Sequence, residues 1–120
     1  MTKYGAIDAF WNSFGIPAYM DGNVPEKAVL PYITYTWNDG DIYSGETNST
    51  VQLHYYGDSE AQPNAKLTEI SNTFGLGGIR LSYTGGGIWL KKGTPWAQPL
   101  TDPDDKRYKR RILNISIEVI

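Results

Sequence analysis

Residue types that do chemistry in proteins are scarce in this chain. His54 is the only histidine among 120 residues, and cysteine is absent. A Ser–His–Asp device depends on a histidine beside its nucleophile, and a zinc site needs more nitrogen or sulfur ligands than one histidine offers. The lack of cysteine excludes disulfides, thiolate metal sites and a cysteine nucleophile. We therefore expect no catalytic residue, no metal and no cofactor, and we interpret His54 as a surface or edge histidine.

Two groups of aspartates have the chemistry to hold Ca²⁺ or to act as general acid and base: Asp39 with Asp41, and Asp102 with Asp104 and Asp105. Neither group has the spacing of the twelve-residue EF-hand loop. Nothing around them completes a glycosidase-like pair. Both groups include Gly or Pro, which is typical of turns. We interpret them as turn residues.

Two glycine-rich segments, residues 75–78 and 85–87, invite comparison with phosphate-binding loops. A P-loop needs the pattern GxxxxGK[ST], and a dinucleotide-binding loop needs GxGxxG between a strand and a helix. Neither pattern occurs in the chain. Glycines of ordinary turns account for both segments, because turns often need backbone angles that only glycine adopts easily.

A basic cluster at residues 106–111 holds five of the eleven Lys and Arg residues. It contains Tyr108, and aromatic rings among basic residues occur in many nucleic-acid-binding sites. Three aspartates come just before it, and the net charge of the whole chain is −2. Ion pairing between subunits, or a solvated start of a strand, is therefore favoured over nucleic-acid binding.

Aromatic residues make up 13% of the chain, with nine tyrosines and four tryptophans. This content favours a β-rich domain and a surface that meets a partner, since Tyr and Trp are enriched at interfaces. Tyr83, Trp89, Trp96 and Tyr108 could form a platform for stacking sugar rings, so a carbohydrate-binding module is an alternative. Trp37 and Trp89 could equally cover the core or an interface, and no sequence rule separates these interpretations.

The elements that must position these residues follow from periodicity and turn residues. Residues 2–14 predict a helix capped by Thr2, and a second helix follows a capping-box pattern at residues 59–62 and ends at Gly75. Pro63 falls in its first turn, where proline is tolerated. Strands are predicted at residues 31–37, 50–56, 79–83, 88–92 and 111–119.

The predicted fold class is α+β, an antiparallel β-sheet of four to five strands with two helices packed on one side. We expect a polar loop over residues 38–48 and a Pro-containing loop over residues 93–105. Alternation of apolar and polar residues predicts a core that consists of Ile33, Val51, Leu53, Leu67, Ile70, Phe74, Leu113, Ile115 and Ile117.

Length and composition fit one domain over residues 1–120, with 40% hydrophobic and 20% charged residues. The N-terminus has no apolar run like a signal peptide, and no segment approaches the roughly 20 apolar residues of a membrane span. We expect no membrane partner.

Four segments, in this order, resemble the tail terminator proteins of long-tailed bacteriophages, which are also called tail-completion or minor capsid-type proteins. They span nearly the whole chain: residues 14–19 with 24–25 and 30–35; residues 51–56 leading into 60–74; residues 87–98; and residues 102–105 followed by 110–119. The loop of residues 38–48 departs from the family.

The resemblance implies a non-enzymatic structural protein that forms a ring, expected to be a hexamer. Such a ring caps the finished tail tube, stops its polymerisation and joins the tail to the head connector. The implied partners are other copies of the chain, the major tail tube protein and the head-closure protein, with a passing contact to DNA in the lumen. The implied location is the virion neck, assembled in the host cytoplasm. A heterologous interface that closes on itself builds such a ring.

We expect the assembly surface on the loop of residues 93–105 and the adjacent basic cluster. An apolar centre with charged residues at its edge is how interfaces are built, and Trp and Arg are favoured at their hot spots. The predicted residues are Trp96, Pro99, Leu100, Asp102, Arg107 and Arg110. Alternatives are another phage neck or tail subunit, such as a head-closure protein, a carbohydrate- or nucleic-acid-binding module, and a small enzyme, which the lone His54 disfavours.

Overall fold

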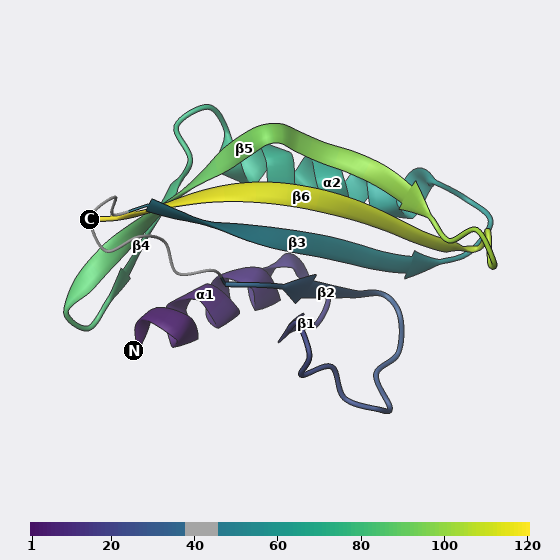
Figure 1. Cartoon of the computed structure of the whole chain (residues 1–120), viewed down its shortest axis with the longest axis horizontal. Helices are drawn as coiled ribbons and strands as arrows, with labels where there is room; N and C mark the ends of the chain where they lie inside the picture. Colours follow the sequence, from purple (N-terminus) through teal and green to yellow (C-terminus); the bar gives the residue numbers. More distant parts are fainter. Residues whose placement is uncertain (38–45) are drawn as a thin grey trace.

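A computed structural model describes residues 1–37 and 46–120 of the chain. It is an α+β fold in which two helices pack against a six-stranded mixed sheet that curls into a half-barrel (Figure 1). The elements are α1 (Lys3–Trp11) with a 3₁₀ turn η1 (Asn12–Phe14), β1 (Ala18–Met20), β2 (Tyr32–Tyr35), β3 (Glu46–Tyr56), α2 (Ala61–Phe74), β4 (Ile79–Tyr83), β5 (Gly86–Thr101) and β6 (Tyr108–Val119).

The strand order is β1-β2-β3-β6-β5-β4, and only β1 and β2 run parallel to each other. The α+β class is thus as predicted, but a purely antiparallel sheet of four to five strands is wrong. The prediction missed β1, which has three residues inside a segment rich in Gly and Pro. A strand this short carries too little alternation to be recognised.

The start of α1 is as predicted, and the start of α2 is not. The Thr2 hydroxyl accepts a hydrogen bond from the Gly5 N–H at 3.0 Å. In α2 the N-cap is Glu60, without a side-chain cap, and the Ser59 hydroxyl instead accepts from the Ala61 N–H at 3.0 Å. The predicted capping box does not form. The Glu60 carboxylate instead binds Arg111.

Both helices pack on the concave face of the sheet. Phe10 and Trp11 of α1 meet Phe74 of α2, with ring centroids 5.7 and 6.1 Å apart. Beneath them lie inward side chains of five strands. Eight of the nine predicted core residues are buried, and Leu67 is half-buried against the same cluster, so the assignment of faces is confirmed: Ile33, Val51, Leu53, Ile70, Phe74, Leu113, Ile115 and Ile117.

The curl brings the two ends of the sheet toward each other across α1. This helix contacts β1 at one edge and β4 at the other. The Met1 ammonium group donates to the Thr84 hydroxyl at 3.0 Å, and the Thr84 N–H donates to the Met1 carbonyl at 2.8 Å. The first residue is therefore tied to the hairpin that joins β4 to β5.

The predicted loop of residues 93–105 is mostly strand, which corrects that prediction. Strand β5 continues to Thr101, and its register against β6 shifts between Lys92 and Ala97. At this bulge a Cβ on Gly93 would lie 2.8 Å from the Asn114 carbonyl oxygen, so only glycine fits. Strand β3 also begins earlier than predicted, at Glu46, while residues 38–45, with Asp39 and Asp41, lie outside the described residues.

Pro99 is tolerated in β5 because its missing N–H faces the free edge. The Asp102 N–H donates to the Tyr108 carbonyl, and Gly87 and Ile120 exchange both backbone bonds. Even-numbered residues of β6 therefore form the backbone hydrogen bonds to β5. Pro99 lies opposite the odd-numbered Arg111, so its backbone nitrogen points away from β6. Beyond the bulge no described strand lies on that side. Proline on a free edge prevents pairing with a further strand.

The core assignment predicts the cost of truncating the two central strands. Leu53 and Leu113 are both 0% exposed, so Leu53→Ala or Leu113→Ala should lower the free energy of unfolding by about 2–5 kcal/mol. Urea denaturation measures this. Leu76→Ala is the matched control, because Leu76 is fully exposed and its loss should cost under about 0.5 kcal/mol. A loss below about 1 kcal/mol at both buried sites would contradict the assignment of faces.

Candidate assembly surface

The tip of the β5–β6 hairpin is built from the aspartates that the sequence marks as turn residues. The Asp102 carboxylate accepts from the Asp104 N–H at 2.8 Å, and the Asp105 carboxylate accepts from the Arg107 N–H at 3.0 Å. These bonds hold a compact turn at one end of the long axis of the molecule (Figure 1). The interpretation of Asp102 and Asp105 as turn residues is confirmed.

The six predicted interface residues do not form one patch. Leu100 and Arg110 face each other across β5 and β6 on the outer face of the sheet, and Asp102 and Arg107 lie at the hairpin tip. Pro99 lies on the inner face, where it borders an open groove of about 510 Å³ between α2 and β5. Strand alternation separates these side chains, which a loop would not do.

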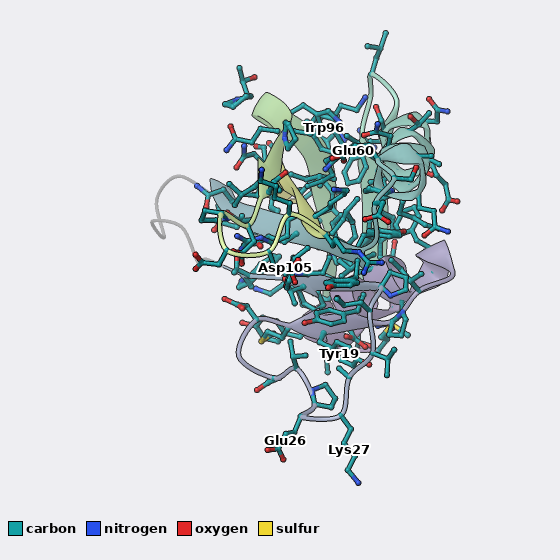
Figure 2. The ribbon with its side chains drawn as sticks, turned by 90° about the vertical axis from the view of Figure 1, so that its right-hand side faces the viewer. Tyr19, Glu26, Lys27, Glu60, Trp96 and Asp105 are labelled. Carbon is teal, nitrogen blue, oxygen red and sulfur yellow. The ribbon has the colours of Figure 1, made fainter. Side chains whose placement is uncertain are left out.

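Trp96 is held against the protein's own core. Its ring centroid lies 5.5 Å from that of Phe74, and the Lys92 ammonium lies 5.3 Å from the indole centroid. Figure 2 shows Trp96 far from Asp105. Packing onto its own sheet is the alternative that the sequence left open for this residue. A role for Trp96 as an interface anchor stays a prediction.

The basic cluster divides between two faces. Arg107 is exposed, pairs with Asp58 at 3.1 Å and lies over the Tyr56 ring at 5.0 Å. Such an exposed pair contributes little stability. Lys109 and Arg111 point inward with the core residues of β6 and are buried.

Glu60 joins the two buried cations. Its carboxylate binds the Arg111 guanidinium and lies 3.6 Å from the Lys109 ammonium. Arg111 also donates to the Asn64 side-chain oxygen at 2.9 Å. The hydrogen bond from Arg111 lowers the pKa of Glu60. The alternation of β6 carried a signal for this site, because Lys109 and Arg111 share the parity of Leu113 and Ile115.

An aromatic row crosses the outer face of four strands next to Arg110. The ring centroids of Tyr19 and Tyr32 lie 5.8 Å apart, those of Tyr32 and His54 lie 4.9 Å apart, and those of His54 and Tyr108 lie 5.9 Å apart. Cross-strand register produces this row, since Tyr32, His54 and Arg110 are neighbours in successive strands. Sequence reasoning missed it, because the pairing of strands was not known.

His54 faces away from the core, as predicted, but it is 7% exposed and not a surface histidine. Both ring nitrogens have partners: the Thr34 hydroxyl lies 2.8 Å from Nε2 and the Tyr108 hydroxyl 2.7 Å from Nδ1. Burial, with a further contribution from the charge of Arg110, lowers the pKa of His54 to about 4. A neutral, fully bonded imidazole of this kind is a structural element of the outer face.

The sugar-stacking platform considered from the sequence does not form. Trp89 pairs across the sheet with Glu118, and its indole N–H donates to the Gly77 carbonyl at 2.6 Å. Tyr108 is ten residues away on the same strand as Glu118, roughly 33 Å along β6. Trp96 lies on the opposite face of the sheet.

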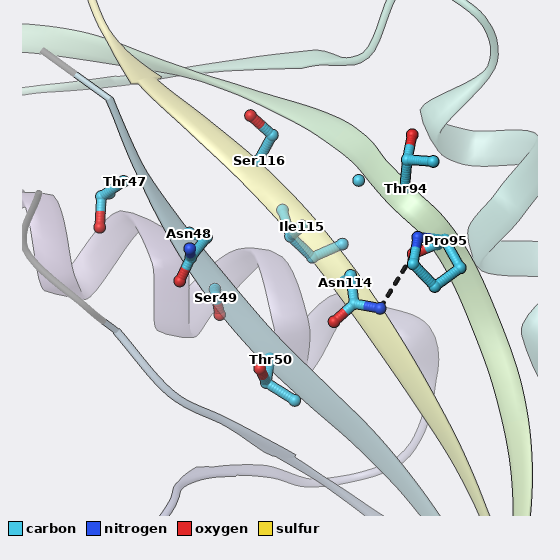
Figure 3. Close-up of a pocket in the computed structure, with 10 residues that line it drawn as sticks. Thr47, Asn48, Ser49, Thr50, Thr94, Pro95, Asn114, Ile115 and Ser116 are labelled. Atoms are coloured by element: carbon cyan, nitrogen blue, oxygen red, sulfur yellow. Dashed lines mark hydrogen bonds between the residues drawn. The ribbon is translucent and has the colours of Figure 1, made fainter. Parts of the chain in front are cut away.

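A shallow hollow of about 620 Å³ lies where β5 bulges away from β6 (Figure 3). Hydroxyl and amide side chains dominate its lining, including Thr50, Thr94, Asn114 and Ser116, and no side chain in it is an acid or a base. The Asn114 amide donates to the Pro95 carbonyl at 2.9 Å. The hollow offers polar contacts but no group for proton transfer or metal binding.

Within residues 1–37 and 46–120, no three His, Asp or Glu residues come together in a way that could hold a metal ion. The helices in this part of the chain are too short and too polar to cross a bilayer.

The burial of His54 predicts a specific pH dependence of stability. The folded chain keeps the ring neutral down to about pH 4, whereas the ordinary pKa is 6.5, so an unfolded chain takes up the proton first. Stability should therefore fall as the pH drops from 6.5 to 4, by up to about 3 kcal/mol. Urea denaturation at pH 7 and pH 4.5 measures the loss. A His54→Gln variant should lose less over this interval; an equal loss in both proteins would contradict the assignment.

Comparison with known proteins gives no assignment. No protein-family model matches the chain, and neither any curated protein nor any solved structure matches it. A function must therefore be argued from the sequence and the geometry of the chain itself.

Proposed function

We propose that this chain is a non-enzymatic tail terminator of a long-tailed bacteriophage. Identical copies form a ring, expected to be a hexamer, that caps the tail tube and stops its polymerisation. The ring then joins the tail to the head-closure or connector protein. It is assembled in the host cytoplasm and becomes part of the virion neck, where DNA passes through its lumen. The ordered sequence resemblance supports this proposal, together with the surface described next.

The observation that carries the proposal is the charged end of the molecule at the β5–β6 hairpin. The side chain of Leu100 is 38% exposed there, although its strand β5 is paired with β6 at this position. Arg110 lies opposite it on β6, and Arg107 and the aspartates of the hairpin tip follow further along the same end, so charge of both signs lies near it. An apolar contact point with a charged rim is typical of a surface that binds another protein.

The free strand edges favour association through side chains and not through added strands. Pro99 blocks the edge of β5 beyond the bulge. At the opposite edge, the Asn12 side chain accepts from the Ala18 N–H at 2.9 Å and donates to the Ala18 carbonyl at 3.3 Å. A subunit with blocked edges does not extend into an open sheet. This suits a ring of fixed size, which needs a heterologous interface that closes.

A second phage neck or tail role, such as head closure, uses the same kind of surface and remains the alternative. The two roles differ in the partner that the ring binds first. A terminator binds the growing tail tube, whereas a head-closure protein binds the connector. Since one fold supports many functions, partner binding separates them and the fold does not.

The proposal predicts that the chain stops growth of a tail tube. Tail tube protein encoded next to this chain should polymerise into long tubes alone and into short, capped tubes when the chain is added. Electron microscopy measures tube length. Binding to the connector with no effect on tube growth would contradict the terminator role and support head closure.

A substitution at the hairpin end tests the surface itself. Leu100→Glu places a charge at the apolar centre of the proposed interface, so it should abolish capping while circular dichroism stays unchanged. Leu76→Glu is the matched control, because Leu76 is an exposed leucine on another loop, between α2 and β4. If the two variants cap tubes equally well, the hairpin end is not the assembly surface.

A further inference from the structure

The outer face of the sheet carries a patch in which aromatic and aliphatic side chains flank Arg110. We define the tyrosine–arginine patch as Tyr32 of β2, Tyr108, Arg110 and Ile112 of β6, and Leu100 of β5. His54 of β3 lies between Tyr32 and Arg110 in the cross-strand register. Four of the patch residues are half-buried and Leu100 is exposed. The hydrogen-bonded His54 forms the floor of the patch. Tyr and Arg are the residues most enriched at binding hot spots.

Arg110 is a cation without a counter-ion in residues 1–37 and 46–120. Arg107, Lys109 and Arg111 each pair with a carboxylate, but Arg110 does not. Its Nε is buried and has no hydrogen-bond partner, and its guanidinium carbon lies 5.5 Å from the centroid of the Tyr108 ring. A partly desolvated guanidinium with an unsatisfied N–H is stabilised when a carboxylate binds it.

The same chain presents a free carboxylate on a different side. Glu26 lies in the segment between β1 and β2, which projects from the sheet edge, and Figure 2 shows its side chain pointing outward at the end remote from Trp96. Several other acidic groups of the described chain are engaged: Asp8 with Tyr35, Asp58 with Arg107, Glu69 with Lys66, and Glu118 with Lys91.

Apolar groups accompany Glu26 on this projecting segment. Pro25 comes directly before it, and Val29 is 80% exposed. A carboxylate beside exposed apolar groups is complementary to a guanidinium beside exposed rings and Leu100. Asp21 and Asp104 are also unpaired within residues 1–37 and 46–120. Asp21 acts electrostatically on His54 at the patch and Asp104 lies on the same hairpin as Arg110, so neither would place two different sides of the subunit in contact.

We propose that Glu26 of one copy binds Arg110 in the tyrosine–arginine patch of the next copy, with Val29 packing against its rings. The inference rests on the proposed function and deepens it, because it names the two surfaces that close the ring. The contact joins unlike surfaces, so each subunit uses its patch once and its projecting segment once. Nucleic acid is a poorer occupant, because the patch holds a single cation and the net charge of the chain is −2.

Charge reversal tests the contact with the full-length chain. Arg110→Glu and Glu26→Arg each place like charges opposite one another, so each variant alone should need about tenfold or more higher concentration to assemble than wild type. An equimolar mixture of the two variants restores opposite charges at every contact of an alternating ring. It should assemble within about threefold of wild type, and so should the double variant. Sedimentation velocity over a concentration series measures assembly.

Two controls keep the outcome interpretable. Lys27→Glu changes the neighbouring charge on the same projecting segment and should assemble as wild type does. Circular dichroism checks folding, and because Glu26 is exposed, Glu26→Arg remains informative even if Arg110→Glu fails to fold.

Several results would overturn the contact. Single variants that assemble like wild type would remove it while leaving capping of tail tubes, and thus the proposed function, untouched. Failure of the mixture and of the double variant to recover assembly would also overturn it. A wild type that stays monomeric at every concentration and does not cap tubes would remove both. Fluorescence anisotropy with a single-stranded oligonucleotide covers the remaining case: binding that Arg110→Glu abolishes and Glu26→Arg preserves would assign the patch to nucleic acid.

Discussion

Strand β6 is the constraint on which the rest of this fold depends. It pairs with β3 along eleven residues and with β5 on both sides of the bulge, so it fixes the register of the two longest neighbours. Because side chains alternate along it, one parity supplies core residues such as Leu113 and Ile115, and the other supplies Tyr108 and Arg110. A slip of one residue would exchange the two sets, and this makes the register strongly specified.

The alternation of inward and outward side chains continues into the charged half of β6, where the inward residues are cations and not apolar residues. Lys109 and Arg111 continue the inward parity beyond the apolar residues, so two cations enter the concave face. Their burial is sustained by Glu60 and Asn64 at the start of α2. The ion pair thereby positions the first turn of the helix over the sheet. A buried charge without a partner would be strongly destabilising, so the pair links the docking of α2 to the sheet register.

Periodicity predicted most of the fold, since the core faces of α2, β3 and β6 each carry several apolar residues in phase. It failed where strands are short or contain turn residues. Strand β1 has only three residues, and the second half of β5 contains Gly93, Pro95 and Pro99, which indicate a loop by composition. Pro99 is compatible with a strand because no strand of the described chain pairs with that edge beyond the bulge, and the sequence does not reveal which strands lie at an edge.

The candidate surface was harder to predict than the fold, because it depends on which strands are neighbours. Treated as a loop, residues 93–105 place Trp96, Pro99 and Leu100 in one patch; as a strand they alternate, and Trp96 packs on Phe74. Pairing of β2 with β3 and of β3 with β6 instead gathers Tyr32, His54, Tyr108 and Arg110 from positions up to 78 residues apart in the sequence.

The curvature of the sheet decides which of its two faces is left for a partner. The concave face is filled by α1 and α2, so the convex face is the extended surface left for a partner. On that face Arg110, which has no counter-ion among the described residues, is half-buried beside the Tyr108 ring. A guanidinium in such surroundings binds a carboxylate more strongly than an exposed one does, because water screens it less.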